Sequence, residues 1–269
     1  MRYIICFEFL GENFFGSQKQ PDKRTVQEEI EKALCTLIKD NISIIISGRT
    51  DAGVSAKHQV AHFILNDKIL DKEKFLYSLN CILPEDIAVF ELKEVDFDFH
   101  AQKSAKYKHY RYSIQNNRVA SVFCRENLLF YPNCQLNVDR LNESLSCLIG
   151  YHDFSSFKTK SQNPYDDCEL YFAQATEIKG DWQKYIFIDV IGNRFLYNMI
   201  RTIVGQLLLI ERNKLNPLVM KDVLEKKDRK CAANVVDAKG LTLEYVGYDD
   251  VDSYIQKIIH KRKVNNENI

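Results

Sequence analysis

The sequence predicts an α+β fold, in which a sheet has helices packed against it. Short segments with strand and helix patterns alternate along the chain, and the second half repeats the rhythm of the first. The chain has 269 residues and 45% hydrophobic content, enough for one large domain or two smaller ones with real cores. These observations exclude a chain that is disordered throughout.

The first half opens with a strand pattern over residues 3–10. Thr25 and Glu28 have the spacing of a capping box, which predicts a helix from Val26 onward. A run of β-branched residues at 42–46 predicts a buried strand that leads into a polar loop. A second apolar strand at 60–65, a helix at 72–80 and an extended segment at 103–114 follow.

In the second half, apolar spacing predicts a helix over 138–149 that stops at Gly150. Strands are expected at 169–178 and 185–191, and the longest helix at about 195–211. Another helix starts at Pro217, and a terminal helix ends in Lys261-Arg262-Lys263. We expect an N-terminal half of residues 1–116, a C-terminal half of 117–250 and a basic tail of 251–269.

The charge balance gives little indication of a partner, because 37 basic and 37 acidic residues cancel. An RNA-binding surface would need local segregation of charge. The 8 cysteines include no pair at the two-residue spacing of zinc or redox sites, so we expect reduced thiols. Since no segment approaches the roughly 20 apolar residues of a membrane helix, the expectation is a cytoplasmic protein without a membrane partner.

The polar loop at 47–54 carries the best candidate for chemistry. Gly48 and Gly53 flank Arg49 and Asp51, so the backbone can turn sharply and present both side chains. A carboxylate is ionised at neutral pH and can attack carbon without a separate base. The alternative is structural, with Asp51 capping a turn and Arg49 paired to it.

Cations and tyrosines interleave along the extended segment at 103–114, a pattern expected of an RNA-binding groove. The residues are Lys103, Lys106, Lys108, His109 and Arg111, with Tyr107, Tyr110 and Tyr112. An amphipathic edge strand is the alternative.

Several motifs resemble the bacterial tRNA pseudouridine synthase A family, in the same order and over about residues 3–249. The central motif is Arg49-Thr50-Asp51-Ala52-Gly53, within 47–54 and followed by 59–63. The other matching segments are 9–18 with 25–28, 99–101 with 110–112, 153–157, 192–201 and 238–241. A single motif would be weak, but this ordered set favours the enzyme over the structural alternative.

The resemblance implies two ferredoxin-like halves and the isomerisation of uridine to pseudouridine at tRNA positions 38 to 40, in the anticodon stem-loop. It implies Asp51 as nucleophile, attacking base or sugar, and Arg201 as its ion-pair partner. Tyr110 would stack on the flipped uracil, and Arg49 would contact the RNA or form a structural salt bridge. It further implies tRNA as partner, a homodimer, no cofactor and no metal; the sequence likewise contains no dinucleotide or phosphate-binding motif.

Three departures from the family pattern accompany these matches. Ser17 stands where the family has Trp, 55–58 replaces a His-Gly continuation, and 234–237 lacks the usual Pro. Since Asp51, Tyr110 and Arg201 are intact, the departures bear on substrate choice more than on chemistry. The alternatives are therefore the same reaction on another RNA, or a non-catalytic RNA chaperone.

Overall fold

The computed structural model describes residues 1–123, 127–159, 165–180 and 182–267, with the side chains of the last helix described as far as Lys261. The strands of its sheet are β1 (Arg2–Phe9), β2 (Ile45–Ile46), β3 (Ser55–Ile64), β4 (Ile87–Val95), β5 (Tyr107–Gln115), β6 (Leu129–Phe130), β7 (Gly150–Asp153), β8 (Asp167–Lys179), β9 (Lys184–Gly192) and β10 (Leu241–Gly247). The α-helices are α1 (Val26–Ile38), α2 (Lys72–Ile82), α3 (Val138–Ser146), α4 (Met199–Arg212), α5 (Val219–Lys226) and α6 (Val251–Glu267). The predicted class, an α+β fold with a mixed sheet flanked by helices, is confirmed.

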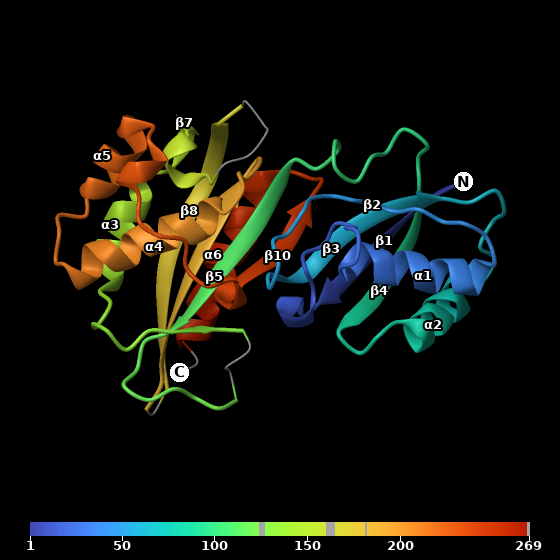
Figure 1. The fold of residues 1–269 in the computed structure, drawn as a ribbon, viewed down its shortest axis with the longest axis horizontal. Coiled ribbons are helices and arrows are strands. Elements are labelled where there is room, and N and C mark those ends of the chain that lie inside the picture. Colours follow the sequence, from blue (N-terminus) through green and yellow to red (C-terminus); the bar gives the residue numbers. More distant parts are fainter. Residues whose placement is uncertain (124–126, 160–164, 181, 268–269) are drawn as a thin grey trace.

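One sheet runs through both halves of the chain, in the order β4-β1-β3-β10-β5-β9-β8-β7, with β2 on β3 and β6 on β5 (Figure 1). Most neighbours are antiparallel, whereas β10 runs parallel to β3 and β6 runs parallel to β5. β10 therefore joins the N-terminal strands to the C-terminal ones, with Leu243 opposite both Ala56 and Tyr110.

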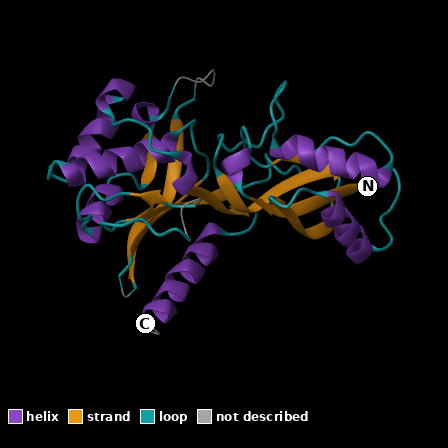
Figure 2. Cartoon of the chain, turned by 60° about the horizontal axis from the view of Figure 1, so that its bottom comes forward, coloured by secondary structure: helices purple, strands orange, loops and turns teal. Residues whose placement is uncertain are grey.

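The helices cover the two faces of the sheet unequally. α1, α3, α4 and α5 lie on one side, and α6 projects from the other (Figure 2). The side chains of β5 point alternately to these two sides of the sheet. Tyr110 packs toward the segment before α4, in ring contact with Phe195, whereas Tyr107 and His109 contact Tyr254 of α6.

The basic and aromatic residues of β5 therefore divide between the two faces of the sheet. β5 lies between β10 and β9, so the alternative of an edge strand is wrong. Arg111 and His109 both bind the buried Asp189 on the α6 side, with Nε and Nε2 at 2.8 and 2.6 Å from Oδ1. These two cations therefore do not share a face with Tyr110.

The predicted capping box of α1 is wrong. Thr25 occupies the N-cap position, but its side chain makes no hydrogen bond to the helix. Instead, the backbone carbonyls of Gly16 and Ser17 accept hydrogen bonds from the amides of Val26 and Gln27 at 3.4 and 2.9 Å. The loop after β1 thus replaces the side-chain cap.

Two further expectations differ from the structure at element ends. Of the predicted strand at 42–46, only Ile45 and Ile46 form β2, while Ile42 and Ile44 are buried outside any strand. The helix predicted to stop at Gly150 ends at Ser146. Gly150, with φ at +109°, instead begins β7.

α4 begins later than predicted, and this difference shapes the site. Asn198 has a left-handed backbone with φ at 61°, and the helix starts only at Met199. Phe195, Leu196 and Tyr197 therefore form an irregular segment in place of a helical turn.

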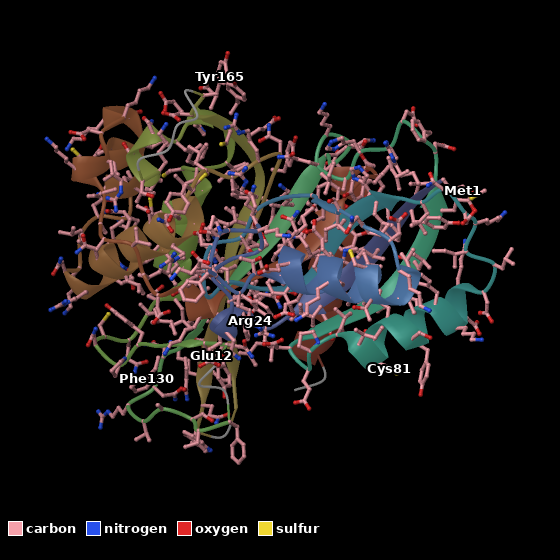
Figure 3. All side chains as sticks on the ribbon, turned by 45° about the vertical axis from the view of Figure 1, so that its right-hand side comes forward. Met1, Glu12, Arg24, Cys81, Phe130 and Tyr165 are labelled. Carbon is pink, nitrogen blue, oxygen red and sulfur yellow. The ribbon has the colours of Figure 1, made fainter. Side chains whose placement is uncertain are left out.

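Side chains spread over both ends of the elongated molecule. Met1 and Cys81 mark the N-terminal half, and Phe130 and Tyr165 lie at opposite edges of the C-terminal half (Figure 3). Within the described residues, no helix combines the length and the apolar character that crossing a bilayer requires.

Candidate active site

A cavity of about 550 Å³ lies where the loop between β2 and β3 meets β5 and the segment before α4. Its lining includes three of the four predicted site residues, Arg49, Asp51 and Tyr110. The other lining residues are Gly48, Thr50, Val54, Gln102, Lys108, Arg194, Phe195, Leu196, Tyr197, Asn198, Met199, Ile200 and Leu241.

The loop that carries Asp51 is fixed by the connection between β1 and α1. The buried Ser17 hydroxyl accepts a hydrogen bond from the Thr50 amide at 2.8 Å, and the Ser17 amide donates to the Thr50 carbonyl at 3.3 Å. Gly16 has φ at +92°, and a Cβ there would lie 2.8 Å from the Thr50 carbonyl oxygen. This close approach of backbone explains the glycine.

The start of the same loop is fixed by a buried glutamine on β3. Gln59 accepts a hydrogen bond from the Ser47 hydroxyl at 2.6 Å and donates one to the Gly48 carbonyl at 3.1 Å. The loop is therefore bonded at its start to β3 and near Asp51 to the β1–α1 connection, which limits how far Asp51 can move.

Asp51 pairs with Arg201, as the family resemblance implied, although 149 intervening positions separate them in the sequence. Nη1 of Arg201 lies 3.5 Å from Oδ2 of Asp51. The guanidinium also donates to Oδ1 of Asn198 and to the carbonyl of Val236, both at 2.8 Å. The left-handed Asn198 and the divergent segment 234–237 thus aim Arg201 at the carboxylate.

The environment of Asp51 acts on its charge in two directions. Burial raises the pKa of Asp51 above its ordinary value of 3.8, while the charge of Arg201 and a hydrogen bond from it oppose that rise. Burial thus disfavours the anionic form of Asp51, and Arg201 is the neighbour that favours it.

Tyr110 forms one wall of the cavity and is only 7% exposed. Its ring meets Phe195 edge to face, with centroids 5.1 Å apart. Burial, and then the charge of Asp51, raise the pKa of the Tyr110 phenol, so it remains neutral at physiological pH. An aromatic face and a protonated hydroxyl are thus presented beside the carboxylate.

Sequence reasoning missed several residues of this site. In the sequence Ser17 stands out only as a departure from the family pattern, yet its hydroxyl bonds the loop that carries Asp51. Phe195 was assigned to a helix, which hid its contact with Tyr110. Lys108 was grouped with other cations, although its spacing of two from Tyr110 is the signal that places both on one face of a strand.

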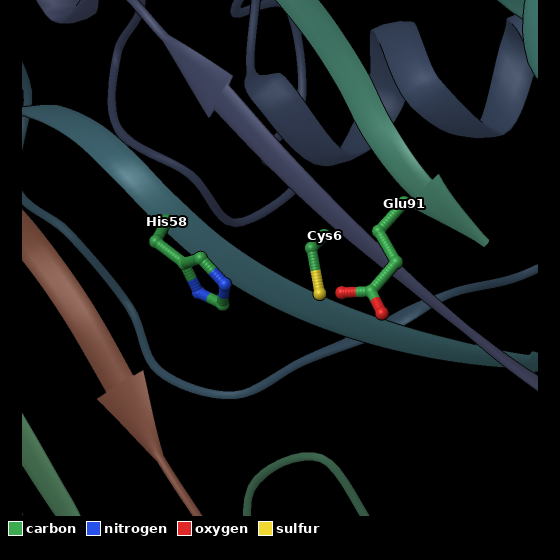
Figure 4. Close-up of side chains that lie close together, drawn as sticks. All are labelled: Cys6, His58 and Glu91. Carbon is green, nitrogen blue, oxygen red and sulfur yellow. The ribbon is translucent and has the colours of Figure 1, made fainter. Parts of the chain in front are cut away.

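One group of three potential metal ligands occurs in the described residues: Cys6, His58 and Glu91, with ligand atoms within 4.8 Å of one another (Figure 4). It lies on the α6 side of the sheet, since His58 packs on Tyr245 at 4.5 Å between ring centroids. Burial and a hydrogen bond to Glu91 raise the pKa of the Cys6 thiol. None of the three lines the Asp51 cavity, which lies on the other side of the sheet.

Comparison with known proteins identifies the family of the chain. The family model for tRNA pseudouridine synthase matches residues 5–103 and 145–249. The chain is 39% identical to tRNA pseudouridine synthase A of Brevibacillus brevis over 249 residues, which cover 92% of this chain and 99% of the relative. It is 40% identical to the protein of the same name from Bacillus subtilis over 253 residues, covering 93% and 100%. A match of this extent, through both halves and the Asp51 loop, shows that the chain belongs to the tRNA pseudouridine synthase family.

Proposed function

We propose that this protein isomerises uridine to pseudouridine in tRNA, with Asp51 as the nucleophile. The observation that carries the proposal is the ion pair of Asp51 with Arg201 at the wall of a cavity shared with Tyr110. A carboxylate attacks carbon only as an anion, and a guanidinium favours the anionic form. Membership of the family and the names of the relatives support the same reaction.

The reaction balances without an oxidant or reductant. The N1–C1′ bond breaks, the uracil turns, and a C5–C1′ bond forms; C5 loses one proton and N1 gains one. Asp51 would attack either the ribose or the base, and in both routes it is released when the new bond is complete. No redox cofactor or metal is required by this balance.

Three side chains would assist Asp51. Tyr110 would replace the stacking that uracil loses when it flips out of the RNA, a contribution of ~1–3 kcal/mol per base. A neutral phenol is not a base, so its hydroxyl would act at C5 only as a relay that passes its own proton to water as it receives the C5 proton. Arg201 would keep Asp51 ionised, and the exposed Arg49 at the cavity would contact the RNA backbone near the flipped nucleotide.

The finer parts of the proposal rest on the resemblance. We place the target uridines in the anticodon stem-loop, the enzyme in the cytoplasm, and two copies of the chain in a homodimer. A monomeric mass at working concentration would refute the last point.

The test uses purified protein, an unmodified tRNA pool and no added cofactor, with pseudouridine mapped at single-nucleotide resolution. Wild-type protein should modify the anticodon arm, and Asp51→Asn, which nearly keeps the shape but removes the charge, should not. Asp252→Asn, at an exposed position on α6, is the matched control. Full activity of Asp51→Asn would refute the nucleophile, and pseudouridine formed only in another RNA would refute the substrate.

A further inference from the structure

Lys108 is a cation that lines the Asp51 cavity and has no ion-pair partner among the described residues. Its half-buried side chain lines the same cavity as Asp51 and Tyr110. In the part of the chain that the structure describes, the Lys108 ammonium forms no salt bridge and no hydrogen bond. By contrast, Arg201 bonds three groups and Arg194 donates to the carbonyl of Tyr165 at 2.9 Å.

The Lys108 ammonium lies directly beside Gly48. A Cβ at Gly48 would collide with the Nζ atom of Lys108. The charge therefore lies against the backbone of the Asp51 loop, three residues before the nucleophile. Gly48 has an ordinary backbone conformation, and the Lys108 ammonium stands at the end of a flexible side chain, so this contact records where the ammonium lies and does not by itself require glycine.

The positive charge of Lys108 is partly removed from water. Burial lowers the pKa of Lys108 to about 8, with no neighbouring charge opposing the shift. Hydrated ammonium groups are costly to desolvate unless an anion replaces the lost water. Around it, Arg49 and Arg194 add positive charge, and Asp51 is already paired with Arg201.

We propose that the Lys108 ammonium binds a phosphate of the uridine nucleotide that enters the Asp51 cavity. The inference rests on the proposed function, because it takes RNA as the substrate. An ammonium binds phosphate as a point charge. Tyr110 lies two residues further along the same strand, roughly 7 Å away, which allows the base to stack there while a phosphate reaches Lys108.

Five other ionisable residues line the cavity with Lys108. They are Arg49 and Asp51 from the loop, Tyr110 from β5, and Arg194 and Tyr197 from the segment before α4. The raised pKa keeps Tyr110 neutral. Lys108 is thus the group expected to lose a positive charge between about pH 7 and pH 9.

The experiment measures binding separately from turnover. Dissociation constants for unmodified tRNA are determined with Asp51→Asn protein, which is expected to bind without reacting, at several salt concentrations and at about pH 7 and pH 9. The same protein is then compared with Lys108→Met, Lys108→Arg and, as control, Lys74→Met, which removes an exposed lysine on α2. Pseudouridine formation is measured in the parallel variants that retain Asp51.

Lys108→Met should weaken binding and reduce the slope of log Kd against log salt by about 0.7 to 0.9, the loss of one phosphate contact. Binding to the Asp51→Asn reference should weaken from pH 7 to pH 9 by up to about tenfold per pH unit above the pKa, since one proton is linked to the contact. Lys108→Arg should restore binding and remove that pH dependence. Lys74→Met should match the reference.

An unchanged salt slope in Lys108→Met, or a pH dependence that persists in Lys108→Arg, overturns the proposal. A lower kcat with unchanged binding also overturns it, because the ammonium would then act on the reacting base. These results are distinct from failure of the proposed function, in which protein with Asp51 intact forms no pseudouridine at all. If Lys108→Met does not fold, the pH profile of Lys108→Arg still decides.

Discussion

The hydroxyl of Ser17 accepts a hydrogen bond from the amide of Thr50 at 2.8 Å, directly before Asp51 in the chain. Both groups are buried, so no water replaces either partner when one is removed. The position of Asp51 therefore depends on a serine side chain where the family pattern has Trp.

Ser17→Ala should leave the buried Thr50 amide without this partner, at a cost of ~1–3 kcal/mol, and should lower kcat because Asp51 is less well positioned. Steady-state kinetics and urea unfolding measure the two effects. Ser253→Ala, on the exposed side of α6, is the control. An unchanged kcat would show that Gly16 and Gln59 are sufficient to position the loop.

Thr25→Val should cost almost nothing, although Thr25 stands at a helix N-cap. Its buried Oγ1 has no hydrogen-bond partner in the described structure, and the backbone there is extended, which suits valine. Replacing an unsatisfied hydroxyl by a methyl of similar shape is near neutral or stabilising. A fall in the free energy of unfolding of more than about 1 kcal/mol, the usual value of a cap, would mean that the hydroxyl caps α1 in solution.

Arg201→Met should move the acid limb of the pH–rate profile to higher pH. Burial raises the pKa of Asp51, and removing the opposing charge of Arg201 raises it further, so the anion is lost at a higher pH as the solution is acidified. Profiles of kcat/KM from about pH 4 to 8 test this. Arg212→Met, exposed on the same helix, should keep the wild-type limb; a coincident limb in both variants would contradict the role of Arg201.

Asp189→Ala should destabilise the protein by ~3–5 kcal/mol, because His109 and Arg111 would lose their buried partner. Burial alone would raise the pKa of Asp189, but His109 and Arg111 outweigh burial and lower it to about 2. The stabilisation that ionised Asp189 contributes to the folded state is therefore complete above about pH 5, and it is lost as the pH falls toward 2. Unfolding measured at pH 7 and pH 3 should show a smaller difference between wild type and variant at the lower pH.

The sequence predicts strands and helices well where a long apolar period exists, and poorly where tertiary contacts decide their ends. β9 agrees with the strand predicted at 185–191, whereas β3 begins at Ser55, before the apolar run predicted at 60–65. The start of α4 was predicted too early, since the apolar spacing of Leu196 and Met199 extends the helical pattern into residues 195–198, whereas the backbone is left-handed at Asn198 and the helix starts after it. The boundary at residue 116 stays a prediction.

For the site, sequence alone supplied Arg49 and Asp51 as neighbours in one loop. The pairing with Arg201 needed the resemblance, since no local signal links residues so far apart in the chain. The role of Ser17 could not have been predicted, because its partner is a backbone amide that any residue at position 50 except proline would provide.

The position of β10 has a consequence for the order in which this protein can be completed during synthesis. β10 lies between β3 and β5, yet it is made after every other strand of the sheet. Until residues 241–247 leave the ribosome, β3 and β5 each present an open edge that can pair with another chain. Leu241, which lines the Asp51 cavity, arrives with β10. The nascent chain therefore depends on late, long-range pairing both to escape aggregation and to complete the Asp51 cavity.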